Sequence, residues 1–215
     1  MPDAPRSFLF LLGSSRTGGN TESLARAAAD HLEPEATQRW IHLGELGLPP
    51  FHDRRHAGDG TTPEAEGAER LVQDATLAAT DLVIASPLYW YSVSASVKNY
   101  LDYWSGWLRV PGLDFKARMA GRRLWGVTAH GDGTPGVAEP LAGTLRLSAA
   151  YLKMDWRGVL LGYGSRPGDV DRDDRALAAA KTFLDSPSTS SASTNSASAN
   201  GTPADPNTQT PGVLY

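Results

Sequence analysis

The amino-acid sequence predicts an α/β fold in which a doubly wound, five-stranded parallel sheet carries helices on both faces. Between residues 5 and 185, short continuous apolar runs alternate with longer segments of helical period. The runs at 8–12 and 81–86 are uninterrupted, as is typical of strands that are buried on both faces of a parallel sheet. Ligands of such sheets bind beyond the carboxyl ends of the strands, so the loops that follow the strands form the candidate site.

Local signals place the individual elements. Strands are expected at 8–12, 39–43, 81–86, 123–128 and 154–163. Helices are expected from a cap at Asn20 or Thr21 to Leu32, from Thr62 and Pro63 to Ala79, over 94–107, between Gly136 and Leu152, and from a cap at Asp169 to Leu184. From Ser186 onward the chain is dominated by Ser, Thr, Ala, Asn, Pro and Gly, which bury too little apolar surface to fold. We therefore expect one domain over residues 1–185 and a disordered tail over 186–215.

Composition excludes several classes of function. The chain has 20 Lys and Arg against 24 Asp and Glu, and this net charge of −4 argues against nucleic-acid binding. It has no cysteine, so disulfides and thiolate metal sites are excluded, and redox chemistry would need a bound cofactor. The run at 8–12 is too short to cross a membrane, and Pro2 and Asp3 stand where a signal peptide has basic residues. We expect a cytoplasmic protein without a membrane or nucleic-acid partner.

The loop after the first strand has the composition of a phosphate-binding loop. It reads Gly13-Ser14-Ser15-Arg16-Thr17-Gly18-Gly19-Asn20-Thr21 and opens directly into a helix. Small residues let backbone N–H groups approach an anion, and the helix N-terminus adds partial positive charge. The spacing mimics a Walker A loop, but Gly19 and Asn20 stand where its Lys and Mg²⁺-binding hydroxyl would be. A phosphomonoester that is bound without metal fits better, and an ordinary turn rich in small residues is the alternative.

A second loop supplies aromatic residues and, with the first, carries a family resemblance. After the third strand the chain reads Ser86-Pro87-Leu88-Tyr89-Trp90-Tyr91-Ser92-Val93-Ser94-Ala95-Ser96-Val97-Lys98-Asn99-Tyr100-Leu101-Asp102. Three adjacent aromatic residues just outside a buried strand are not needed for the core. Together the two loops resemble those of the NADPH-dependent FMN reductase family, in the flavodoxin-like superfamily, over roughly residues 7–185.

This resemblance implies a fold, a cofactor and a set of binding residues. The implied strand order is 2-1-3-4-5, and the implied activity is hydride transfer from NADPH or NADH through bound FMN to a small acceptor such as a quinone or free flavin. By position, the FMN phosphate would be held by Ser14, Arg16, Gly19, Asn20 and Thr21, and the isoalloxazine ring would contact Pro87, Leu88, Tyr89 and Trp90. Direct hydride transfer needs no catalytic acid or base from the protein, so no catalytic residue is expected. The family also implies a homodimer or homotetramer.

The loop after the fourth strand is expected to line the pyrimidine edge of the flavin. In the flavodoxin-like arrangement, His130 and Gly131 bring backbone donors near the flavin N1 and O2 atoms, and Gly133 belongs to the same loop. The glycines here also form a G-x-G-x-x-G sequence, but a dinucleotide-binding fingerprint belongs in the first βα turn. Its acidic residue would be Asp155, near the start of the fifth strand and thus at the wrong edge of the sheet.

Other interpretations stay open at this point. An electron-carrier flavodoxin would bind FMN without nicotinamide turnover, although its usual strongly acidic surface is missing at a net charge of −4. A flavin-binding regulatory module without turnover is a third hypothesis. No metal site is expected from His52, Asp53, His56 and Asp59, which lie on a Gly-rich loop without helical ligand spacing. Four aromatic residues would frame a stacking pocket or a subunit interface, with core packing equally good for the last two: Trp90, Tyr91, Trp104 and Trp107.

Overall fold

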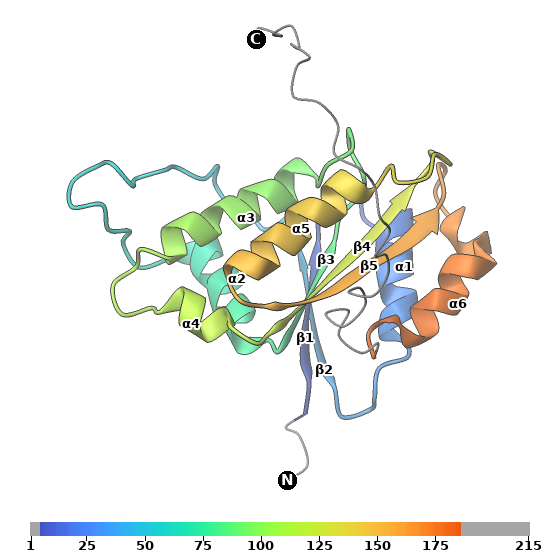
Figure 1. The fold of residues 1–215 in the computed structure, drawn as a ribbon, viewed down its shortest axis with the longest axis horizontal. Helices are drawn as coiled ribbons and strands as arrows, with labels where there is room; N and C mark the ends of the chain where they lie inside the picture. The colour runs from blue at the N-terminus through green and yellow to red at the C-terminus, as the bar shows by residue number, and fades with distance from the viewer. Residues whose placement is uncertain (1–4, 186–215) are drawn as a thin grey trace, which may run out of the picture.

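The computed structural model describes residues 5–185 and contains a five-stranded parallel sheet (Figure 1). Its strands are β1 (Ser7–Leu12), β2 (Thr37–His42), β3 (Asp81–Ala85), β4 (Arg123–His130) and β5 (Asp155–Tyr163), in the order β2-β1-β3-β4-β5. The predicted α/β class and strand order are confirmed. The tail predicted over 186–215 lies outside the described residues.

Helices cover both faces of the sheet. On one face lie α1 (Asn20–Ala29) and α6 (Asp174–Phe183), and on the other lie α2 (Gly67–Ala78), α3 (Ala95–Trp107), α4 (Phe115–Met119) and α5 (Glu139–Tyr151) (Figure 1). Side chains of β1 alternate between two cores: Phe8 and Phe10 pack with α1 and α6, while Leu9 and Leu11 pack with the other helices. None of the helices within the described residues is long and apolar enough to cross a membrane.

The second helix begins later than predicted. Thr62 and Pro63 have the signature of a helix start, yet α2 begins at Gly67. The N–H of Thr62 instead donates to the carbonyl of Arg109 just after α3 (3.1 Å), which holds the long β2–α2 loop against that helix. The short helix α4 was not predicted, because five residues are too few to display a helical period.

The last helix is capped by a different residue from the predicted one. Asp173 caps α6, and its Oδ1 accepts the N–H of Ala176 (3.0 Å). Asp169 precedes a 3-10 turn, η1 (Val170–Arg172), and its carboxylate accepts the N–H groups of Ser165 and Arg166 (3.0 and 2.7 Å). Both acidic residues carry the same capping signal, and their tertiary positions decide which one caps the helix.

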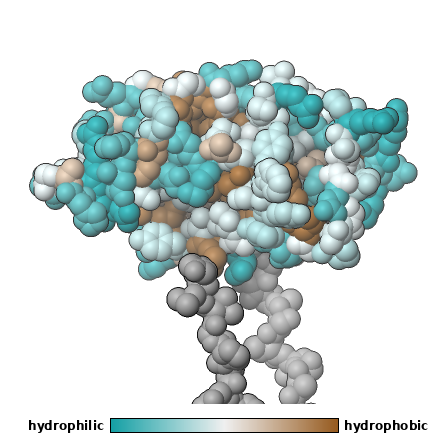
Figure 2. Space-filling view, turned by 90° about the horizontal axis from the view of Figure 1, so that it is seen from above, coloured by the Kyte–Doolittle hydropathy of each residue, from teal (hydrophilic) through white to brown (hydrophobic). Residues whose placement is uncertain are grey.

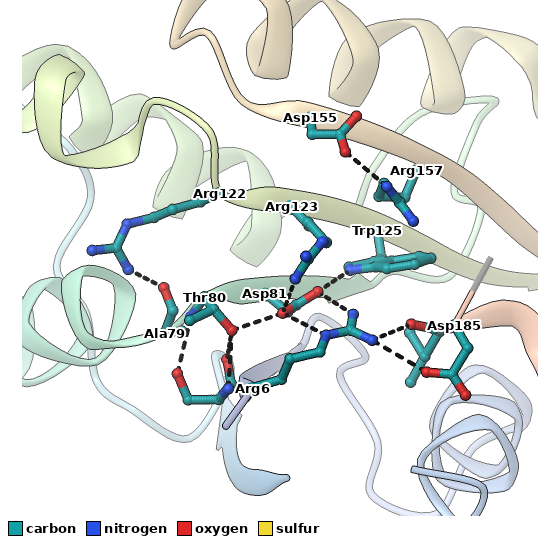
Figure 3. Close-up of polar contacts among 12 residues, drawn as sticks. Arg6, Ala79, Thr80, Asp81, Arg122, Arg123, Trp125, Asp155, Arg157 and Asp185 are labelled. Carbon is teal, nitrogen blue, oxygen red and sulfur yellow. Dashed lines mark hydrogen bonds and ion pairs between the residues drawn. The ribbon is translucent and has the colours of Figure 1, made fainter. Parts of the chain in front are cut away.

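A buried carboxylate joins the amino ends of the strands (Figure 3). Asp81 is fully buried at the start of β3 and accepts hydrogen bonds from Arg6 (2.5 Å), Trp125 Nε1 (2.9 Å) and Thr80 (2.7 Å). Burial acts to raise the pKa of Asp81, but the hydrogen bonds from Arg6 and Thr80 hold it below its usual value. Arg6 also donates to the carbonyl of Leu184 (2.9 Å). This network ties the two ends of the domain together at the edge opposite to the candidate site.

Candidate functional site

Four loops gather at the carboxyl edge of the sheet. They follow β1, β3, β4 and β5, which are neighbouring parallel strands, so the loops start side by side (Figure 1). The first three are the loops that the sequence singled out. The fourth, residues 164–169, was not predicted, because it carries no recognisable motif.

The β1–α1 loop offers free backbone donors at the start of α1. Gly19, rather than Asn20 or Thr21, is the cap residue, and the first helical hydrogen bond runs from the N–H of Ser23 to the carbonyl of Gly19 (2.9 Å). The N–H groups of Asn20, Thr21 and Glu22 therefore have no acceptor within the helix. Such N–H groups, together with the partial positive charge of a helix N-terminus, bind phosphate well. The residues present thus fit the phosphate of FMN.

The side chains predicted to cap α1 hold neighbouring loops instead. Asn20 Nδ2 donates to the carbonyl of Arg166 (2.8 Å), and Asn20 Oδ1 accepts the N–H of Gly168 (3.0 Å), both in the β5–α6 loop. Thr21 is buried, and its hydroxyl oxygen accepts the N–H of Ala129 at the end of β4 (3.3 Å). The prediction that these two residues cap the helix was wrong, because the cap position belongs to Gly19. Their backbone N–H groups remain available to an anion.

Ser14 and Arg16 shape the first half of this loop. Ser14 is buried, and its Oγ accepts the N–H of Arg16 (3.0 Å). Arg16 itself is exposed and has no ion pair with any residue between 5 and 185. Gly18 has a φ of +64°, which only glycine adopts without strain. The loop therefore combines a rigid backbone with one free guanidinium group.

Glu22 is a residue of this loop that the sequence analysis missed. Its carboxylate accepts the N–H of Gly18 (2.8 Å) and pairs with Arg26 (2.7 Å). Burial acts to raise the pKa of Glu22, but the hydrogen bonds from Gly18 and Arg26 keep it below its usual value. The cap is Gly19 and not Ser or Thr, so the sequence contains no capping box that would have singled out Glu22. Glu22 fixes the loop from the side of the helix.

The β3–α3 loop contains a tight turn that exposes aromatic rings. The backbone groups of Tyr89 and Ser92 bond each other in both directions (3.2 and 3.1 Å), which closes a two-residue turn at Trp90 and Tyr91. Both turn residues have positive φ (49° and 65°), a conformation that costs free energy in residues other than glycine. Trp90 is 93% exposed. Such turns favour Asn and Gly, so two bulky rings here indicate that the rings themselves are needed.

The first and second loops are in direct contact. A Cβ at Gly13 would lie 2.3 Å from Cγ2 of Val97, so only glycine lets the β1–α1 loop approach the start of α3. Ser96 Oγ donates to the carbonyl of Gly13 (3.1 Å). Pro87 and Leu88 are half-buried at the base of the aromatic turn. The structure therefore brings the predicted phosphate loop and the predicted ring loop together.

The β4–α5 loop forms the third wall. His130 Nδ1 lies 2.7 Å from the carbonyl of Asp132, which folds the loop back on itself. A Cβ at Gly131 would lie 3.0 Å from Cβ of Ser165, whereas one at Gly133 would meet nothing within 4 Å. The loop is thus packed on one side and open at Gly133.

A buried hydroxyl without a partner lies near the start of the β4–α5 loop. Thr128, two positions before His130, is fully buried, and its Oγ1 has no hydrogen-bond partner among residues 5–185. Buried hydroxyls are normally satisfied, so this unpartnered hydroxyl beside a candidate site needs a reason. An additional polar group bound at this edge of the sheet would supply one.

Several other candidate residues lie away from this edge. Trp104 and Trp107 are 5% and 0% exposed in the core, which confirms the core-packing interpretation for them. Asp53 pairs with Arg55 (2.6 Å) on the β2–α2 loop. The described residues contain no group of three or more His, Cys, Asp or Glu that could hold a metal ion. Asp155 is the first residue of β5 and lies at the opposite edge of the sheet, whereas the acidic residue of a dinucleotide-binding fingerprint lies at the carboxyl end of a strand.

Comparison with known proteins agrees with this geometry. Residues 7–154 match the family described as NADPH-dependent FMN reductase. The chain belongs to this family. The chain is 33% identical over 173 residues to the protein YwqN of Bacillus subtilis, named as an NAD(P)H-dependent FMN-containing oxidoreductase, with 80% of this chain and 93% of that relative covered.

Solved structures show the same fold. The Trp repressor binding protein from Bacillus subtilis superposes on the FMN reductase with a TM-score of 0.63 at 27% identity, covering 82% of this chain and 97% of that one. An NADH:FMN oxidoreductase, EMOB, gives a TM-score of 0.60 at 20% identity, covering 84% and 87%. The flavodoxin-like fold is confirmed. The chain is an FMN-dependent NAD(P)H oxidoreductase with FMN as cofactor and NADPH or NADH as co-substrate, which sets aside the electron-carrier hypothesis.

Proposed function

We propose that the FMN reductase binds FMN across the four loops, with the phosphate at the start of α1 and the ring beside the aromatic turn. The phosphate ligands are the side chains of Ser14 and Arg16 and the N–H groups of Gly19, Asn20 and Thr21. The supporting observation is that the first turn of α1 leaves its N–H groups free in a loop that touches the start of α3. No carboxylate other than that of Glu22 hydrogen-bonds within this loop, and Arg26 offsets its charge.

The ring binds against Pro87, Leu88, Tyr89 and Trp90. The strained, exposed turn carries this part of the proposal, because a ring that stacks on a flavin repays the cost of its backbone conformation. His130, Gly131 and Gly133 border the pyrimidine edge, where their donors oppose the negative charge that forms on reduction. Bound FMN supplies the chemistry of hydride acceptance and electron return, while the chain supplies position and electrostatics.

The acceptor is a small planar molecule such as a quinone or free flavin. The exposed rings of Tyr89, Trp90 and Tyr91 offer flat apolar surfaces at the open side of the site. On the face seen in Figure 2, hydrophobic side chains form several small patches separated by polar surface. An aromatic acceptor that enters after the nicotinamide has left would stack in the same place.

The enzyme acts as a homodimer or homotetramer in the cytoplasm, where NADPH is supplied. The family resemblance supports this assembly, and sedimentation velocity of the full chain tests it. A monomeric wild type would contradict the assembly.

Steady-state kinetics test the acceptor. NADPH is varied at several fixed concentrations of a water-soluble benzoquinone or of riboflavin, and the FMN-loaded enzyme is expected to give the parallel double-reciprocal lines of a ping-pong mechanism. Intersecting lines would contradict the proposal that the nicotinamide leaves before the acceptor binds at the same stacking site. Absence of turnover with both acceptors would contradict the assignment of the acceptor class.

A further inference from the structure

The loop between β5 and η1, residues 164–169, is held rigidly beside the proposed FMN site. The Asn20 amide bonds the carbonyl of Arg166 (2.8 Å) and the N–H of Gly168 (3.0 Å). The carboxylate of Asp169 accepts the N–H groups of Ser165 (3.0 Å) and Arg166 (2.7 Å). An exposed loop with this many fixed backbone groups has a defined conformation on which a side chain can be presented with little entropic cost.

This loop touches two of the other walls. The N–H of Gly164 donates to the carbonyl of His130 (3.0 Å). Ser165 lies against Gly131: a Cβ added at Gly131 would lie 3.0 Å from the Cβ of Ser165. Through Asn20, the next residue is fixed to the start of α1. Arg166 therefore stands between the phosphate end of the site and the wall that borders the pyrimidine edge.

The guanidinium of Arg166 is free to meet a ligand. Arg166 is exposed, and no carboxylate of residues 5–185 lies within ion-pair distance of it. Asp169, in the same loop, accepts two backbone N–H groups; those of Arg166 and Ser165 lower its pKa, and the positive charge of the Arg166 side chain lowers it further without a direct ion pair. On the other side of α1's N-terminus, Arg16 is likewise exposed and unpaired. Two exposed guanidinium groups, those of Arg16 and Arg166, therefore flank the start of α1.

We propose that Arg166 is a specificity-determining residue that binds the 2′-phosphate of NADPH and so makes the enzyme prefer NADPH over NADH. The inference rests on the proposed placement of FMN, because that placement assigns the FMN phosphate to the first turn of α1 and leaves Arg166 for the co-substrate. A guanidinium fork matches a terminal phosphate with two parallel charge-assisted hydrogen bonds. NADH lacks this group and gains nothing from Arg166.

The test compares Arg166→Gln with wild type and with Arg118→Gln, all as full chains loaded with FMN. Arg118 is also exposed and without an ion pair among the described residues, but it lies on α4, which precedes β4 and is therefore at the opposite edge of the sheet. The control removes the same charge far from the site. In Arg166→Gln, KM for NADPH should rise at least about tenfold, because the pair of charge-assisted hydrogen bonds is lost, with kcat and KM for NADH within twofold of wild type. Arg118→Gln should leave all of these values unchanged.

Equilibrium binding provides a readout that does not depend on turnover. Adenosine 2′,5′-bisphosphate should bind the FMN-loaded wild type about tenfold more tightly than 5′-AMP in calorimetric titrations, and Arg166→Gln should abolish this difference. Equal losses for NADPH and NADH would overturn the assignment to the 2′-phosphate, as would unchanged values for both. A weaker FMN affinity in Arg166→Gln would also overturn it, because the arginine would then serve the FMN phosphate. Failure of the wild type to bind FMN would instead refute the proposed FMN site, and FMN content is measured first for that reason.

Discussion

The aromatic turn at Trp90 and Tyr91 is expected to make the protein less stable than it would be with ordinary turn residues. The two residues have φ values of 49° and 65°. Asn and Gly adopt these conformations readily and are favoured in such two-residue turns. We therefore consider the double substitution Trp90→Asn and Tyr91→Gly. Trp90 is 93% and Tyr91 53% exposed, so the change removes little packing.

The size of the effect follows from the backbone. A left-handed conformation costs an ordinary residue about 1–2 kcal/mol, so the two residues together store about 2–4 kcal/mol. The glycine introduced at position 91 lowers this gain in stability by about 0.5–1 kcal/mol, because it raises the entropy of the unfolded chain. Residual strain at Asn and the lost contacts of the half-exposed tyrosine reduce the gain further, which leaves about 1 kcal/mol. For a domain of this size that corresponds to a rise in Tm of about 2–4 °C.

Thermal unfolding of the FMN-free protein measures the change in stability, and fluorescence titration with FMN measures the change in FMN affinity. The double variant should unfold at the higher temperature and bind FMN about tenfold more weakly, because stacking is lost. Lys153→Gly is the matched control: Lys153 also has a positive φ of 57°, but it follows α5 at the opposite edge of the sheet. This control should gain stability in the same way and keep its FMN affinity. A lower Tm in the FMN-free double variant, or unchanged FMN affinity, would refute the reasoning.

Three further changes give independent tests. Arg16 is exposed, so Arg16→Glu should strongly weaken FMN binding through repulsion of the phosphate while the circular dichroism spectrum is kept, and normal FMN affinity would refute the phosphate assignment. Asp81→Asn should lower the free energy of unfolding by about 2–4 kcal/mol at pH 7. Because the pKa of Asp81 is lowered in the folded protein, its contribution is present above the unfolded pKa of about 3.9 and is lost as the pH falls through the folded value. Urea unfolding should therefore show the gap closing below pH 4, and a pH-independent gap would contradict this. Removal of residues 186–215 should leave Tm and FMN affinity unchanged, and a large loss of either would show that the segment contributes to the domain.

The sheet and three of its loops were predictable because their signals are local. The apolar runs in β1 and β3 have no other explanation than burial on both faces, and these strands lie at the centre of the sheet. The position of the β1–α1 loop was predictable from small residues before a helix, and its binding of phosphate stays a prediction. The aromatic loop after β3 could be singled out because its rings are not needed for the core, but the tight turn at Trp90 and Tyr91 was not predicted.

The remaining features depend on contacts between distant parts of the chain. The side-chain amide of Asn20 donates to the carbonyl of Arg166, which is 146 positions away, and the sequence near either residue does not predict this contact. Asp169 and Asp173 look alike as caps, and only the path of the chain after β5 separates them. Thr62 has the sequence signal of a helix start, but its N–H bonds the carbonyl of Arg109 and holds the loop against α3. Asn20 and Thr62 thus bond partners far along the chain, whereas Asp169 bonds N–H groups of its own loop.

The most direct test of the central claim is an anaerobic titration of the purified, full-length protein with NADPH. We expect the protein to carry one FMN per chain, released on heating and identified by chromatography, and we expect one equivalent of NADPH to remove its visible absorbance. Release of FAD, failure of the folded protein to bind FMN, or bound FMN that neither NADPH nor NADH reduces would contradict the account.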